Sequence, residues 1–169
     1  KDSLSSTEIQ AKLKEIRKTI KAGYIDEKLL FQLTINLYKT YPNTKIRLRS
    51  STNCEDLPKF NGAGLYLSEG LKTTTSEAFI LPYNDYLKVP EQEKVGDSLL
   101  QKKILKVYAS LWTWEAFQER EYYGIDHSKA AMAILIHEAF PDEAANGVIL
   151  TQPQLDGGIS ILVNVQSGD

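Results

Sequence analysis

Apolar residues recur every three or four positions through residues 5–41, and this spacing predicts two amphipathic helices. The first helix begins at a capping box, in which Ser5 and Glu8 satisfy each other's free backbone N–H groups, and Gly23 ends it. The second helix begins with Asp26 as its N-cap and ends before Pro42, which cannot continue a helix. We interpret both helices as packing elements. Their apolar stripes are Ile9, Leu13, Ile16 and Ile20, and Leu30, Leu33, Leu37 and Tyr41.

The pattern changes over residues 45–49, where polar and apolar residues alternate and predict a strand with two arginines on one face. We expect a polar loop over residues 50–56 and a glycine-rich turn over residues 61–64. The turn leads into a short apolar strand at residues 65–67. This middle stretch therefore combines strands with two polar connections.

The next stretch has no clear period. Residues 71–76 are polar and predict a loop, while residues 77–93 carry Pro82 and Pro90 with aromatic residues between them. We expect the second segment to be irregular or only briefly helical. Two interpretations stay open for it, an insertion or the lining of a substrate cleft.

Helical spacing returns at Asp97, which we expect to cap a helix that extends to Leu111. A further helix is predicted from Trp114 to Tyr123, with Gly124 as its stop. Aromatic residues at helical spacing are typical of core packing, so we interpret this part of the chain as an aromatic centre. Its members are Trp112, Trp114, Phe117, Tyr122 and Tyr123.

The last third predicts β-structure. The continuous apolar run over residues 131–136 is typical of a strand buried on both faces. A turn at Asn146-Gly147 precedes a strand over residues 148–151, and a turn at residues 156–158 precedes a strand that ends at Val165. These strands predict an antiparallel meander. Since helices come first and strands later, the expected fold class is α+β.

Composition narrows the possible partners. The 169 residues suffice for one domain with a real core, and a net charge of −2 gives no electrostatic case for binding nucleic acid or an anionic membrane. No run approaches the ~18 consecutive apolar residues of a membrane span, and the first residues lack the apolar core of a secretory signal. One cysteine fits a reducing cytoplasm, and with only two histidines it leaves no plausible zinc site. Because the chain stops in a polar turn after a strand, we interpret it as an excised domain.

Candidate chemistry concentrates in residues 45–66, which combine a cation, small hydroxyl and amide groups, and a glycine loop. The guanidinium of Arg49 offers a planar fork for phosphate oxygens. The loop of Gly62, Ala63 and Gly64 would let backbone N–H groups approach the same oxygens. This combination suits a polyphosphate.

Other interpretations of the same residues stay open. Spacing alone supports equally well a surface Arg49 paired with Glu55 or Asp56. The glycine loop matches neither a Walker loop nor a dinucleotide-binding fingerprint. Asp126 and His127 have the residue types of a catalytic dyad, but no nucleophile is placed beside them, so we interpret them as a turn.

A second set of polar candidates belongs to the later strands. Glu138, or a backbone group beside it, could contact a base edge where the buried strand emerges, and a solvated charge is the equal alternative. We interpret the neighbouring His137 as a structural histidine. Asn164 and Gln166 alternate on the last strand and project to one face, where their oxygens could help hold Mg²⁺ beside phosphates.

Several of these segments resemble one known family. Residues 48–58, LRSSTNCEDLP, resemble the VRSSATAEDLP motif in the nucleotide-binding domain of phosphoenolpyruvate synthases and pyruvate phosphate dikinases. Further segments resemble, in order, the family's VWASLF, VAVLVQEMV, ASGV and NAQGED motifs, and they are residues 107–112, 132–140, 145–148 and 164–166. Their order and spacing agree from Ile46 to the end, which makes the set specific. Residues 53–56 with 62–66 are more similar to the glucan water dikinases.

The resemblance implies an ATP-grasp-like fold that binds ATP between subdomains. It further implies that a phosphoryl group passes from ATP to a histidine on a separate domain and then to pyruvate, or to a glucan in the related branch. Arg49 matches the family's phosphate-binding arginine, and the loop from Gly62 to Gly64 matches the loop over the phosphates. Ile136 to Ala139, which include His137 and Glu138, match the strand and hinge beside adenine, and Gln166 matches the glutamine on the metal and phosphate side.

The chain also departs from the family pattern. We find no glycine-rich segment with a phosphate-binding lysine before Ser3, and Ser160 stands where the dikinases have a glutamate. The family's phosphohistidine motif and pyruvate-binding barrel do not occur within residues 1–169. We therefore expect residues 1–169 to be a partial ATP-binding domain of a larger phosphotransferase, with ATP and Mg²⁺ as cofactors and little activity alone. Two alternatives are a non-catalytic nucleotide-binding or interaction module and a fragment of a glucan-type dikinase.

Overall fold

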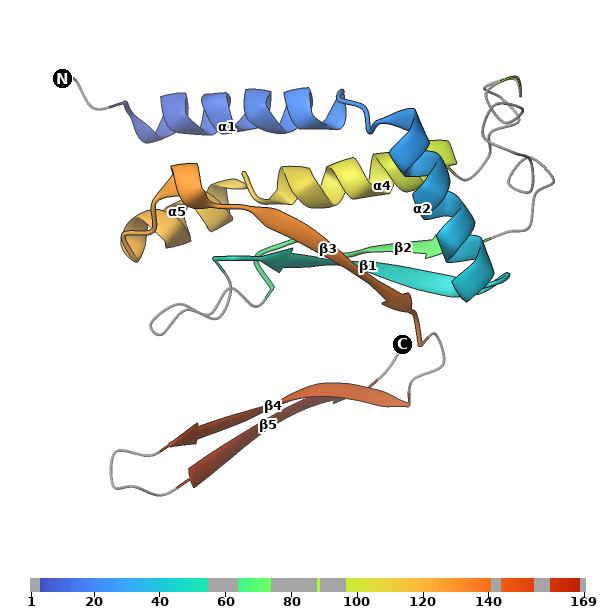
Figure 1. Cartoon of the computed structure of the whole chain (residues 1–169). Helices are drawn as coiled ribbons and strands as arrows, with labels where there is room; N and C mark the ends of the chain where they lie inside the picture. The colour runs from blue at the N-terminus through green and yellow to red at the C-terminus, as the bar shows by residue number, and fades with distance from the viewer. Residues whose placement is uncertain are drawn as a thin grey trace. The chain divides into compact units, whose positions relative to one another are not determined.

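The computed structural model describes residues 4–54, 64–73, 88, 97–140, 144–153 and 159–167. The chain divides into two compact units, residues 1–139 and residues 140–169 (Figure 1). The segment over residues 77–93, which we predicted to be irregular, lies outside the described residues except for Lys88.

The first unit begins with two helices, α1 (Ser6–Lys21) and α2 (Glu27–Thr40). The predicted capping box is confirmed, because Ser5 N donates to Glu8 Oε2 at 2.8 Å and Glu8 N donates to Ser5 Oγ at 3.4 Å. Asp26 is the N-cap of α2, and its Oδ1 accepts from Leu29 N at 2.9 Å. Both helices therefore start at the positions that their local sequence predicts.

Three antiparallel strands form the sheet of this unit, in the order β2-β1-β3. They are β1 (Lys45–Thr52), β2 (Glu69–Lys72) and β3 (Met132–Glu138). The predicted loop at residues 50–56 was placed too early, because β1 continues through Thr52. The strand predicted at residues 65–67 is wrong, and part of β2 falls in a predicted loop. Residues 69–72 form a strand because they pair with β1, which places Leu71 opposite Ile46 and buries it beside that residue.

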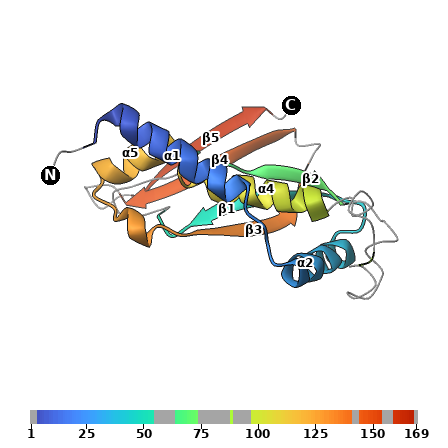
Figure 2. The same ribbon diagram turned by 90° about the horizontal axis from the view of Figure 1, so that it is seen from above.

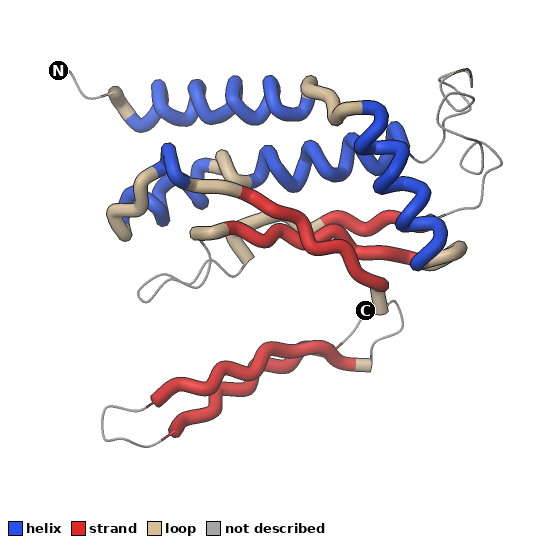
Figure 3. The backbone as a smooth tube through the Cα atoms, viewed as in Figure 1, coloured by secondary structure: helices blue, strands red, loops and turns tan. Residues whose placement is uncertain are grey.

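Helices cover one face of this sheet. Helix α4 (Asp97–Ser110) contacts all three strands, and α1 lies on α4 (Figures 1 and 2). Figure 3 shows α1 and α4 on the same side of the three strands. The core between α4, α2 and the sheet consists of Leu30, Leu37, Ile46, Leu48, Leu71, Leu100, Ile104 and Val107.

Helix α5 (Trp114–Tyr122) differs from its predicted role. Thr113 caps it, and Gly124 follows it with a φ of +66°, as the predicted glycine stop requires. The predicted aromatic centre is wrong for its two tyrosines, because Tyr122 and Tyr123 are 82% and 42% exposed. The buried residues of α5 are instead Ala116 and Arg120.

Strand β3 is not buried on both faces, which corrects the prediction from its apolar run. Its inward residues Ile134 and Ile136 pack against the core, whereas Leu135 is 58% exposed. The reason is that the helices of the first unit cover only one side of the sheet. An apolar run alone does not say whether a second layer is present.

The second unit holds one hairpin, β4 (Ala145–Pro153) paired with β5 (Ile159–Ser167). The predicted turn at Asn146-Gly147 is wrong, because both residues belong to β4. Gly147 lies so close to the partner strand that an added Cβ would meet the carbonyl oxygen of Asn164. The turn predicted at residues 156–158 lies outside the described residues. A single meander is not formed, since β3 pairs with β1, and the mixed helical and antiparallel architecture agrees with α+β.

Candidate functional site

Strand β1 separates two kinds of residue onto its two faces. Ile46 and Leu48 are completely buried under α4, whereas Lys45, Arg47 and Arg49 are exposed on the other face. This separation follows from the alternation of side chains along a strand. Both arginines therefore leave the helix-covered side of the sheet.

The ladder of hydrogen-bonded strands shows which residues share this surface. Residues directly opposite each other in an antiparallel pair point to the same face. Arg47 lies between Gly70 and His137, while Arg49 lies opposite Leu135. We call this surface the open face, and its members are Lys45, Arg47, Arg49, Ser51, Gly70, Lys72, Ala133, Leu135 and His137.

Opposite charges occupy opposite sides of the sheet. The only carboxylates within the three strands are Glu69 and Glu138, which lie opposite Leu48 and Ile46 and so do not belong to the open face. Glu69 binds Lys103 Nζ at 2.8 Å and Lys106 Nζ at 3.4 Å, both from α4. The hydrogen bond from Lys103 lowers the pKa of the Glu69 carboxyl, and Lys106 adds to that effect. The open face thus carries cations without a strand carboxylate to neutralise them.

Arg49 stands near the end of β1 with an exposed side chain. In the part of the chain that the structure describes, it forms no ion pair. Its alternative partners Glu55 and Asp56 lie outside the described residues, as do Gly62 and Ala63 of the candidate loop. Gly64 is described and has a φ of +83°, a conformation that favours glycine.

Two of the polar residues after Arg49, Thr52 and Asn53, form hydrogen bonds within the fold. Asn53 Nδ2 donates to the carbonyl oxygen of Lys129 at 2.9 Å, and Asn53 Oδ1 accepts from Ala131 N at 2.8 Å. Thr52 is buried, and its hydroxyl accepts from Cys54 N at 3.0 Å. The sequence pattern places these small polar groups beside a phosphate; in the structure Asn53 joins the residue after β1 to the residues before β3, and Thr52 bonds within its own turn. The sequence signal was the tendency of Asn and Thr to bond nearby backbone.

His137 and Glu138 end β3 close to the boundary between the units. Nδ1 of His137 lies 2.6 Å from the carbonyl oxygen of Glu138, and since a carbonyl only accepts, Nδ1 carries the hydrogen. Glu138 is exposed. Ala139 N donates to the carbonyl oxygen of Lys45 at 2.7 Å, and the second unit begins at the next residue.

Gln166, the candidate on the metal side, belongs to the second unit. It lies in β5 opposite Asn146, and Asn164 lies opposite Val148. The structure therefore brings Arg49, His137 and Glu138 onto one sheet and places Gln166 in a different hairpin. No cluster of three or more His, Cys, Asp or Glu residues that could hold a metal ion occurs within the described ranges.

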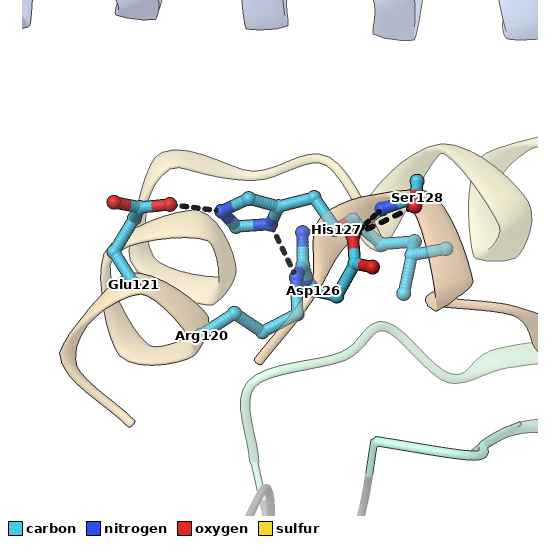
Figure 4. A network of polar contacts seen from close by, with 6 residues as sticks. Arg120, Glu121, Asp126, His127 and Ser128 are labelled. Carbon is cyan, nitrogen blue, oxygen red and sulfur yellow. Dashed lines mark hydrogen bonds and ion pairs between the residues drawn. The ribbon is translucent and has the colours of Figure 1, made fainter. Parts of the chain in front are cut away.

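A separate polar cluster surrounds Arg120, whose side chain is completely buried (Figure 4). Its Nε donates to His127 Nδ1 at 3.0 Å and its Nη2 donates to the carbonyl oxygen of Leu111 at 2.8 Å. The guanidinium lies 5.5 Å from the centroid of the Trp112 ring. His127 Nε2 in turn lies 2.7 Å from Glu121 Oε1. The bonds of Arg120 therefore connect α5 to Leu111, which precedes the helix, and to His127, which follows it.

The predicted turn at Asp126 and His127 is confirmed. Asp126 Oδ1 accepts from Ser128 N at 2.9 Å and from Ser128 Oγ at 2.7 Å, and these bonds lower the pKa of Asp126. A 3-10 helix, η2 (His127–Lys129), follows directly. His127 faces Arg120 and Glu121, so its contacts are not those of a dyad with Asp126 (Figure 4). Sequence reasoning missed Arg120, because an arginine on a helix is normally expected at the surface.

Comparisons with known proteins agree with the motif order. A family model described as the pyruvate phosphate dikinase AMP/ATP-binding domain matches residues 2–168. Rifampicin phosphotransferase from Streptomyces sviceus is 27% identical over 148 residues, which are 87% of this chain and 14% of that protein. Phosphoenolpyruvate synthase from Aeropyrum pernix is 29% identical over 107 residues, which are 63% of this chain and 10% of that protein.

A probable phosphoenolpyruvate synthase from Pyrococcus horikoshii is 27% identical over 123 residues, which are 73% of this chain and 12% of that protein. The chain thus spans 10% to 14% of the length of the curated relatives it matches. No helix in the described part of the chain is both long and apolar enough to cross a membrane.

Proposed function

Because the chain belongs to the family of pyruvate phosphate dikinase AMP/ATP-binding domains, we propose that it is the ATP-binding portion of a larger phosphotransferase of the phosphoenolpyruvate synthase type. In this proposal its fold is ATP-grasp-like. A phosphoryl group passes from ATP to a histidine on another domain of the same protein and then to pyruvate. Residues 1–169 supply the nucleotide site and not the acceptor.

The exposed guanidinium of Arg49 carries the proposal within this chain. Phosphoryl transfer needs mainly positioning and neutralisation of negative charge. Arg49 meets both needs, because its planar fork can hold two phosphate oxygens and no strand carboxylate competes for it on the open face. The family assignment and the geometry thus support the same residue.

Three further assignments complete the proposed site. The loop from Gly62 to Gly64 lies over the phosphates, and His137 with Glu138 lies beside the base. On the second unit, Gln166 in β5, together with Asn164 two positions before it, would supply neutral oxygen ligands for Mg²⁺. When bound, the ion would neutralise phosphate charge.

Other functions stay open beside this one. The relative named rifampicin phosphotransferase aligns with 87% of this chain, and its name adds an acceptor other than pyruvate to the alternatives. The other two alternatives are a glucan-type dikinase and a non-catalytic nucleotide-binding or interaction module. The sequence that flanks residues 1–169 in the full-length gene would discriminate among all of them.

Titration with Mg-ATP tests the proposed site. We expect weak binding and no turnover by this chain, and a loss of affinity of about tenfold on Arg49→Ala, as one charge-assisted phosphate contact predicts. Lys14→Ala is the matched control, because Lys14 is exposed on α1 and its loss also removes one positive charge. Binding that Arg49→Ala leaves equal to the control would contradict the assignment.

A further inference from the structure

Arg49 is not the only cation of the open face. Lys45 and Lys72 lie opposite each other across β1 and β2, and Arg47 stands between Lys45 and Arg49. Lys45 Cε lies 3.9 Å from the position that a Cβ of Gly70 would take, so the Lys45 side chain extends over Gly70 toward the row of Arg47. The four cations form one continuous strip.

Within the described ranges, Arg47 makes no contact that gives it a role in the fold. Arg17 donates to the carbonyl oxygen of Trp112 at 2.8 Å, and Arg120 donates to that of Leu111 at the same distance. Arg47 and Arg49, in contrast, have no acceptor among the described residues and are exposed. Cations packed along one face repel each other unless an anion joins them.

We propose that Arg47 is a second phosphate-binding residue and that Arg47 and Arg49 together bind a polyphosphate chain. This inference rests on the proposed function, because it takes Arg49 as the first phosphate contact. Residues two positions apart on a strand are about 7 Å apart, so the two forks reach different phosphates of one chain. Gly70 beside Arg47 has no side chain that would obstruct the approach of a phosphate.

The arrangement has a consequence for ligand choice. Two guanidinium groups that contact successive phosphates distinguish a triphosphate from a monophosphate, while a single arginine does so weakly. We therefore infer that the open face selects for the length of the phosphate chain.

Nuclear magnetic resonance titrations of the 169-residue chain test this inference. The probes are inorganic tripolyphosphate, ATP and AMP, followed by the amide signals of residues 45–52. The variants are Arg47→Ala, Arg47→Lys and Arg49→Ala, with Lys14→Ala as the charge-matched control. We expect Arg47→Ala to weaken tripolyphosphate and ATP about tenfold and AMP much less, and Arg47→Lys to fall between the two.

The outcomes separate this inference from the proposed function. If Arg47→Ala binds tripolyphosphate and ATP as the control does, while Arg49→Ala binds them more weakly, Arg47 is not a phosphate ligand but the proposed site stands. If neither arginine matters, both proposals fail. Equal losses for AMP and tripolyphosphate, or amide signals that do not move at millimolar ligand, also overturn the inference. Unchanged amide positions elsewhere in the free variants confirm that they fold.

Discussion

Arg120 donates through Nε to Nδ1 of His127 at 3.0 Å, and this bond joins the last turn of α5 to η2. An arginine N–H can only donate, so Nδ1 of His127 is the acceptor and the imidazole carries its hydrogen on Nε2. That nitrogen faces Glu121 at 2.7 Å. Among the residues that the structure describes, the buried guanidinium therefore connects to a carboxylate through the ring of His127.

Replacing Arg120 tests how much this cluster stabilises the first unit. Arg120→Met keeps most of the aliphatic volume but leaves the Leu111 carbonyl and His127 Nδ1 without their donor. We expect the free energy of unfolding to fall by about 2–4 kcal/mol, because each unsatisfied buried group is costly. Urea denaturation measures the change, with Gln118→Ala at an exposed position of α5 as control. An Arg120→Met variant as stable as that control would show that the bonds contribute nothing.

The Asn53 side chain supports a second prediction. Asn53→Ala removes one donor and one acceptor, and we expect it to cost about 1–2 kcal/mol of stability. Asn53→Asp keeps an acceptor for Ala131 N but loses the donor to Lys129. Amide hydrogen exchange at Ala131 should therefore be faster in Asn53→Ala and stay slow in Asn53→Asp. The exposed Ser51, changed to alanine, is the control, and equal exchange in all variants would contradict the role of Asn53.

Glu69 predicts a dependence of stability on pH. Hydrogen bonds from Lys103 and Lys106 hold its pKa below the ordinary value of 4.5 in the folded chain. The ionised carboxylate therefore contributes stability above that value, and the contribution is lost as the pH falls through the folded pKa. Glu69→Gln should cost about 1 kcal/mol at neutral pH and progressively less on acidification. Urea denaturation at a series of pH values from neutral to acidic measures this loss of stability, with Glu15→Gln on α1 as control. A loss of stability that is the same at every pH would refute the prediction.

Two glycines form a matched pair in the two units. Gly147→Ala would push a Cβ against the carbonyl of Asn164, and we expect it to weaken the β4–β5 pairing by about 1–3 kcal/mol. Gly70→Ala meets atoms only at 3.9 Å, which is ordinary contact, and should change stability by less than about 0.5 kcal/mol. Amide hydrogen exchange in β4 and β5 measures the strength of this pairing in the Gly147→Ala and Gly70→Ala variants. Equal protection of β4 and β5 in both variants would show that the close approach is relieved at no cost.

Local sequence predicted the elements whose ends are set by their own residues. The caps at Ser5 and Asp26 and the glycine stop at Gly124 each depend on bonds or backbone angles within one turn, so α1, α2 and α5 were found. Strand β2 was missed, because only its pairing with β1 makes Glu69–Lys72 extended. The same holds for Gly147, whose neighbour Asn146 has turn chemistry that pairing with β5 overrides.

For the candidate site, too, the sequence predicted the local features and not those that depend on pairing between distant segments. Alternation along residues 45–49 placed Arg49 beside Arg47 on one face, and the structure agrees. The charge separation across the sheet needed the register of three strands, which no local pattern gives. The bonds of Asn53 and the burial of Arg120 likewise depend on segments that are distant in sequence or on a neighbouring turn.

The central place of β1 also constrains the order in which the chain folds. Its partner β2 begins at Glu69, but β3 is the last element of the first unit, and the bond between Ala131 and Asn53 spans 78 positions. During synthesis β1 therefore presents one unpaired edge until β3 has emerged from the ribosome. Closing such a long loop is slow, and an open strand edge is prone to pair with another chain meanwhile. An open strand edge thus accompanies the synthesis of the residues between β1 and β3.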